Sequence, residues 1–106
     1  MLHHCGKFDY FIPSYRRIPH VDMLQIGYES NVEAALEAFP ESDVEYCFST
    51  YLLMNGSRNE VRDKTNEILE NARGNWNRFS ITIGDMDFYT PDENLVELYE
   101  CCKKAT

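Results

Sequence analysis

Four carboxylates fall within nine residues near one end of the sequence. They are Asp85, Asp87, Asp92 and Glu93. Hard cations such as Ca²⁺ and Mg²⁺ take carboxylate oxygens, but the spacing does not match the twelve-residue calcium loop. Asp92 and Glu93 suit the first turn of a helix, and no nucleophile or oxyanion donor stands beside Asp85 and Asp87. We therefore expect neither a metal site nor an acid–base pair here.

Soft metal ligands lie near both ends of the chain. His3, His4 and Cys5 are adjacent, and Cys101 and Cys102 stand near the other end. Zinc sites usually carry paired ligands two to four residues apart in each half of the site. Three adjacent ligands fit that pattern poorly, so we expect a mobile terminal segment and no metal.

Cys47 could serve as a nucleophile with His20 as its base. It stands in an apolar stretch, however, where a Cys is far more often a small core residue. The sequence has no P-loop, no dinucleotide-binding glycine fingerprint and no Gly-x-Ser-x-Gly elbow. These observations favour a protein that is not an enzyme and has no cofactor.

The charge balance narrows the classes of partner. The 106 residues carry 18 Asp and Glu against 10 Lys and Arg, a formal net charge of −8. This negative net charge repels nucleic-acid phosphates and anionic membranes, and it attracts a basic partner protein. No secretory signal or membrane-spanning run is visible, so the four Cys are expected as thiols in the cytoplasm.

Three helices are predicted by the same local pattern, a Ser or Thr followed three residues later by Glu and then by an apolar stripe. This capping box satisfies the first free N–H groups of a helix. The pairs are Ser30 with Glu33, Ser57 with Glu60, and Thr90 with Glu93.

Four extended segments lie around these helices. They are Lys7–Ile12, Met23–Tyr28, Val44–Met54 and Phe79–Ile83. The predicted order over residues 1–106 is β-β-α-β-α-β-α in a single α+β domain. We expect a mixed or antiparallel sheet of about four strands, loosely ferredoxin-like, with the three helices packed on one face.

The second face of that sheet would then be uncovered. The long segment Val44–Met54 is nearly equally apolar on both sides, so this face needs a cover: the N-terminal segment, a second subunit in a homodimer, or a ligand. The ligand hypothesis is a small-molecule binder or small enzyme. Its pocket would be lined by Tyr46, Cys47, Tyr51 and Thr82.

An acidic ridge is the least ordinary feature of the surface. Glu29, Glu33, Glu37 and Glu41 repeat every four residues, which places them on one slowly drifting face of a helix. The ridge is either a solvated face or a docking surface for a basic protein. Its lack of Lys leads us to expect a protein-interaction domain, of inhibitor or immunity type, that binds through Glu29, Glu33, Glu37 and Glu41.

Overall fold

The sheet is parallel throughout and its strands follow the order of the chain. The computed structural model describes residues 1–4, 6–84 and 89–105. Within them the four strands lie in the order β1-β2-β3-β4, and every neighbouring pair is parallel. The strands are β1 (Leu2–His4), β2 (Met23–Ile26), β3 (Asp43–Phe48) and β4 (Phe79–Ile83).

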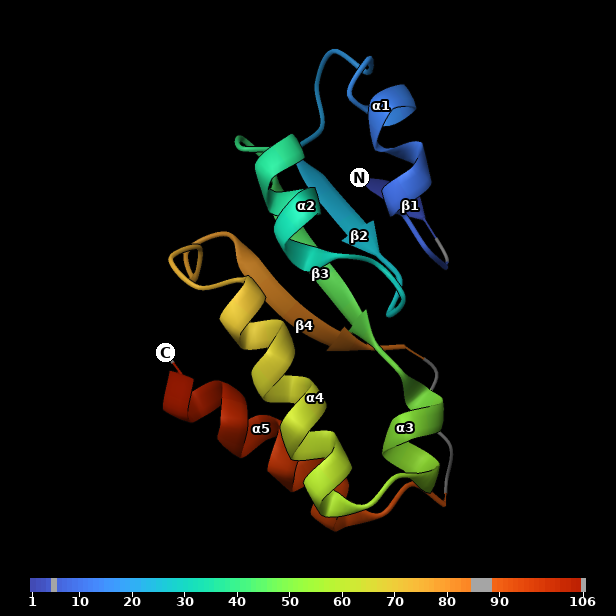
Figure 1. Ribbon diagram of the computed structural model, residues 1–106, viewed down its shortest axis with the longest axis vertical. Coiled ribbons are helices and arrows are strands. Elements are labelled where there is room, and N and C mark those ends of the chain that lie inside the picture. Colours follow the sequence, from blue (N-terminus) through green and yellow to red (C-terminus); the bar gives the residue numbers. More distant parts are fainter. Residues whose placement is uncertain (5, 85–88, 106) are drawn as a thin grey trace.

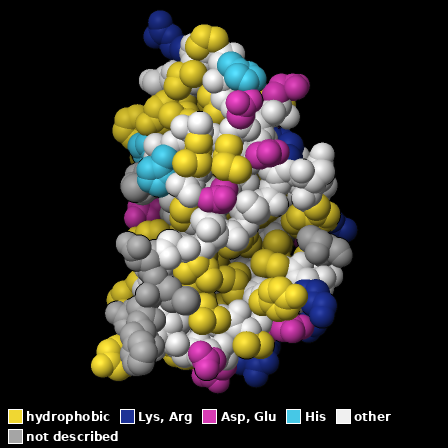
Figure 2. Space-filling view, turned by 180° about the vertical axis from the view of Figure 1, so that it is seen from behind, with side chains coloured by type: hydrophobic (Ala, Val, Ile, Leu, Met, Phe, Trp, Pro, Cys, Tyr) yellow, Lys and Arg dark blue, Asp and Glu magenta, His cyan; other side chains and the backbone are white. Residues whose placement is uncertain are grey.

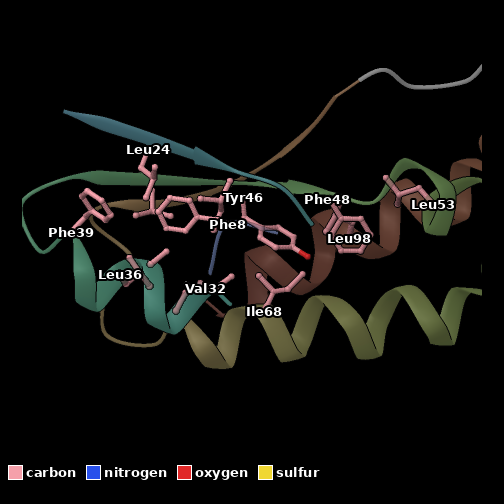
Figure 3. Packing of buried hydrophobic residues seen from close by; sticks show 14 of the residues in the cluster. Phe8, Leu24, Val32, Leu36, Phe39, Tyr46, Phe48, Leu53, Ile68 and Leu98 are labelled. Atoms are coloured by element: carbon pink, nitrogen blue, oxygen red, sulfur yellow. The ribbon is translucent and has the colours of Figure 1, made fainter. Parts of the chain in front are cut away.

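Helices connect each strand to the next, as a parallel pair requires. The described residues form a 3-10 turn and five α-helices. They are η1 (Asp9–Phe11), α1 (Ile12–Tyr15), α2 (Val32–Ala38), α3 (Thr50–Asn55), α4 (Arg58–Asn71) and α5 (Asp92–Ala105). Helices α2 and α4 lie on the same side of the sheet (Figures 1 and 3).

The predicted mixed or antiparallel sheet with three helices is therefore wrong, and the fold is α/β. The error lies in the N-terminal third, where Lys7–Ile12 was predicted as a strand running directly into the next one. This segment instead forms η1 and the start of α1, because Phe8, Phe11, Ile12 and Tyr15 follow helical spacing and share one face. The helical segment supplies a third crossover, so all strands run the same way.

The predicted long strand Val44–Met54 is also corrected. Only β3 is extended, and Ser49 ends it by accepting a hydrogen bond from the Leu52 backbone N–H as the N-cap of α3. Leu53 then turns into the core from a helix. The two apolar faces of that long strand therefore do not exist.

The core fills the space between the sheet and the helices (Figure 3). Leu24 and Ile26 of β2, and Val44, Tyr46 and Phe48 of β3, all point to the helix side and are buried. Each large apolar side chain removed from water stabilises the fold by about 1.5–3 kcal/mol. The intervening residues of these strands point to the other side and stay partly or fully exposed.

Helix α5 is held to the rest of the fold by polar contacts. The Glu97 carboxylate, 7% exposed, accepts a hydrogen bond from Arg62 and lies 3.4 Å from Nε of Arg58, both on α4. The hydrogen bond from Arg62 holds the pKa of Glu97 below its usual range. The Asn94 amide donates to the carbonyls of Leu53 and Gly56 at 2.8 and 2.9 Å. These contacts fix α5 against α4 and the α3–α4 turn.

No helix of the described residues is both long enough and apolar enough to cross a bilayer.

Candidate functional site

An acidic groove lies beside α2. It has a volume of about 550 Å³ and is bounded by α2, the end of α4 and the segment that leads into β4. We call it the α2 groove. It is lined by Glu33, Leu36, Glu37, Pro40, Glu70, Asn71, Arg73, Asn75 and Arg78. The groove therefore combines three carboxylates with two guanidinium groups.

Two of these carboxylates are available for a ligand. Glu33 and Glu37 are exposed one turn apart on α2. Neither side chain forms an ion pair or hydrogen bond with any residue among 1–4, 6–84 and 89–105. A cation placed between them would meet two acceptors and no competing partner.

Both guanidinium groups of the groove are already engaged. Arg78 donates to the backbone carbonyls of Phe39, Ser42 and Leu36 at 2.9, 3.0 and 2.9 Å, and to the Asn75 side chain at 3.1 Å. Its charge thus offsets the negative end of α2. Arg73 lies 3.4 Å from Glu70 in an exposed pair, which is weakened by solvent screening.

The four residues of the predicted ridge do not share one helix. Glu33 and Glu37 lie on α2, whereas Glu29 precedes the helix and Glu41 follows it, because the helix spans only Val32–Ala38. Its N-cap is Asn31, whose side chain accepts from the Ala34 N–H. The predicted box partner of Glu33, Ser30, instead bonds to the N-terminal segment. The structure therefore keeps Glu33 and Glu37 together and sets Glu29 and Glu41 at the two ends.

The predicted pocket residues lie in three different places. Cys47 and Thr82 are cross-strand neighbours on the face turned away from the helices. Tyr46 points to the opposite face, where its hydroxyl donates to the Tyr28 carbonyl at 2.6 Å and burial raises its pKa. Tyr51 is 73% exposed on α3. The structure thus joins Cys47 with Thr82 and separates both from the two tyrosines.

The face turned away from the helices is mixed in polarity and lacks the long apolar strand that was expected on it. Its side chains include Gln25 and Glu45, which are joined by a 2.5 Å hydrogen bond, together with Asp43 and Ser80. Figure 2 shows this side of the molecule, with acidic and histidine side chains among hydrophobic ones over its upper half. The expectation of an apolar reverse side does not hold, because the strand that was to supply it ends at Phe48.

The other candidates for chemistry are dispersed. Asp85, Asp87 and Cys5 lie outside the described residues, and Asp92 and Glu93 form the first turn of α5. His20 pairs with Asp22 before β2 begins, whereas Cys47 lies near the end of β3. Across the described positions, no three His, Cys, Asp or Glu side chains could hold a metal ion together.

The cysteines of the described chain carry thiols, at Cys47, Cys101 and Cys102. Burial raises the pKa of both Cys101 and Cys102, which disfavours the reactive thiolate.

The sequence prediction missed the second wall of the α2 groove. Glu70, Arg73 and Arg78 stand more than thirty residues after Glu33 in the chain. A parallel crossover brings them close, because the residues that enter β4 lie at the same end of the sheet as those that enter β3 from α2. Predicting this second wall from the sequence would have required knowing that the sheet is parallel.

Comparison of the chain with family models, with curated proteins and with solved structures found no match. The functional proposals below depend on the geometry of this chain alone.

Proposed function

We propose that this chain is a non-enzymatic protein-interaction domain that binds a basic segment of a partner protein along α2. The α2 groove receives a Lys or Arg side chain of that segment. One observation carries the proposal: Glu33 and Glu37 are exposed, adjacent and unpaired among the described residues, while Arg78 donates to backbone carbonyls and Arg73 pairs with Glu70.

The charge of the whole chain supports the same partner. A net charge of −8 raises the encounter rate with a basic protein, and contacts in the groove then set its position. The thiols fit a reducing compartment such as the cytoplasm, which we propose as the place of action.

The test uses a labelled synthetic peptide in which single arginines alternate with pairs of alanines. Its binding is measured by fluorescence anisotropy at about 20 mM and about 150 mM salt, between which screening becomes strong. Glu33→Lys with Glu37→Lys replaces two attractive contacts by repulsive ones. We expect the double variant to bind at least about tenfold more weakly at low salt, which corresponds to about 1.4 kcal/mol.

The matched control changes two carboxylates outside the groove. Asp63 and Glu67 are also exposed and four residues apart on a helix, here α4. Asp63→Lys with Glu67→Lys gives the same net charge as the first double variant. An equal loss of binding in both would mean that only net charge matters, and the groove would have no part in recognition.

A further inference from the structure

β4 forms an open edge of the described sheet. Its only strand neighbour there is β3, with Val44 paired to Phe79 and Phe48 to Ile83. The Val44 N–H donates to the Arg78 carbonyl at 2.8 Å. In a parallel ladder alternate residues bond to the same neighbour, so residues 78, 80 and 82 turn their backbone groups to β3. Phe79, Ile81 and Ile83 therefore direct their N–H and C=O groups outward.

Among the described residues, the sequence of this edge has none of the usual protections against pairing with another chain. Edge strands are normally very short or carry Lys, Pro or a bulge. The sequence of β4, Phe-Ser-Ile-Thr-Ile, is five residues long, uncharged and rich in β-branched residues. The opposite edge is β1, which has only three residues. The two edges of the sheet are thus unequal, and β4 is the one suited to accept a strand.

The apolar side chains of β4 are incompletely covered. Phe79, Ile81 and Ile83 point to the helix side, as their partners on β3 do. Those partners are at most 2% exposed, whereas the three β4 side chains stay partly exposed. Helix α5 packs mainly on α4 and α3. An additional strand beside β4 would bury this remaining apolar surface.

Helix α5 also carries apolar side chains that are incompletely covered. Leu95 and Cys102 are half-buried against the core, and Val96 and Tyr99 are 52% and 63% exposed. A strand added at β4 can direct alternate apolar side chains toward the partly exposed Phe79, Ile81 and Ile83.

The opposite face of an added strand would meet negative charge. Glu45 lies across from Ser80, and Asp43 lies on the same face of the sheet. The small Ser80 side chain leaves a long basic side chain room to reach over it toward the Glu45 carboxylate. No residue of the described strands is Lys or Arg, and Glu45 has only a neutral partner, Gln25.

We propose that the free edge of β4 binds an extended segment of a partner protein as a fifth strand, with alternating apolar and basic residues. Backbone hydrogen bonds from Phe79, Ile81 and Ile83 give affinity, and the alternation gives specificity. This surface is separate from the α2 groove and does not depend on the function proposed for it.

The test uses three labelled eight-residue peptides: alternating Val and Lys, alternating Val and Glu, and a block of four Val followed by four Lys. We expect saturable binding of the alternating Val–Lys peptide to the full chain, and at least about tenfold weaker binding of the other two. Binding by the block peptide at equal strength, or no saturable binding of the alternating Val–Lys peptide, would overturn the proposal.

Two variants at Ile81 isolate the backbone contribution. Ile81→Ala and Ile81→Pro both replace the large branched side chain by a smaller apolar one, but only proline also removes the outward N–H. That N–H does not bond to β3, so both variants should fold, as circular dichroism and urea unfolding can check. We expect Ile81→Pro to bind the Val–Lys peptide more weakly than Ile81→Ala by at least about threefold. Equal binding by two folded variants would overturn strand addition.

The remaining controls distinguish peptide binding at β4 from binding in the α2 groove and from self-association of the chain. Glu33→Lys with Glu37→Lys should weaken binding of the Val–Lys peptide no more than Asp63→Lys with Glu67→Lys, which has the same net charge, and a larger loss in the first variant would place the peptide in the α2 groove. Sedimentation of the chain alone tests the second-copy alternative. A dimer that Ile81→Pro dissociates would assign this edge to self-association and overturn the proposed occupant.

Discussion

Arg78 fixes the end of α2, and through it the position of the acidic groove. The guanidinium group has five N–H groups, and it donates four hydrogen bonds: three to backbone carbonyls and one to the Asn75 side chain. The carbonyls belong to the end of α2 and the turn after it, where a helix leaves its last acceptors without partners. A single side chain thus satisfies those acceptors and joins α2 to the start of β4.

Replacing Arg78 should therefore destabilise the fold. Arg78→Met keeps most of the apolar stem but removes the guanidinium donors. Three half-buried carbonyls are then left without a hydrogen-bond donor. We expect the free energy of unfolding to fall by about 2–3 kcal/mol, because hydrogen bonds to charged groups contribute more than neutral ones. Urea denaturation measures the change.

Arg73→Met is the matched control for that change. Arg73 lines the same groove but has only an exposed ion pair with Glu70. Its loss should alter the free energy of unfolding by less than about 0.5 kcal/mol. If Arg73→Met lowered the free energy of unfolding as much as Arg78→Met, the hydrogen bonds from Arg78 to the carbonyls would not contribute to stability.

At the scale of secondary structure, local signals in the sequence predicted some elements well. The Ser57–Glu60 capping box is present with both of its hydrogen bonds, and β4 has the bounds that its alternation indicated. Both patterns are local, since a cap or an alternating strand is specified within a few residues.

Elements whose apolar residues fit two periods were predicted less well. The apolar residues from Phe8 to Tyr15 alternate at first and also follow helical spacing. Contacts of Phe8 with Phe39 and His4 stabilise the helical form. The three-residue strand β1 was missed, because it is too short to show any period and pairs with residues 22 positions away. Sheet direction followed from these two segments, so the parallel topology and the second wall of the α2 groove could not be predicted.

The pairing of β1 with β2 depends on a close backbone approach at Gly27. A Cβ atom at this position would lie 2.6 Å from both the N and the O of Gly6. Backbone atoms cannot move aside as a flexible side chain can. We expect Gly27→Ala to destabilise the fold by about 1–3 kcal/mol in urea denaturation, the usual cost of overpacking.

Gly84→Ala provides the comparison for Gly27→Ala. A Cβ atom at Gly84 would meet no heavy atom of the described residues within 4 Å, so the change should stay within about 0.5 kcal/mol. Equal effects of the two alanine variants would contradict a tight β1–β2 approach. Amide hydrogen exchange at Leu24 and Ile26 would then show whether β1 still pairs.

At the scale of the whole molecule, the excess of carboxylates opposes folding through mutual repulsion. The chain measures 41 × 25 × 18 Å, and its 18 acidic residues outnumber the 10 basic ones. The Debye length is about 30 Å at 0.01 M salt and about 8 Å at 0.15 M, so charges across the molecule repel one another only at low salt. The ion pairs of Glu97 are largely shielded from this screening, because that carboxylate is buried.

Stability at neutral pH should therefore rise with salt. Between 0.01 and 0.15 M NaCl we expect the free energy of unfolding to increase on the order of 1 kcal/mol, with like charges four residues apart contributing a few tenths each. Glu33→Gln with Glu37→Gln changes the net charge from −8 to −6, so this variant should be more stable than wild type at low salt and should gain less from added salt. Urea denaturation of both proteins at the two salt concentrations measures the difference. A fall in wild-type stability with salt would mean that attractive ion pairs outweigh the repulsion, and the unpaired carboxylates of α2 would then cost the fold nothing.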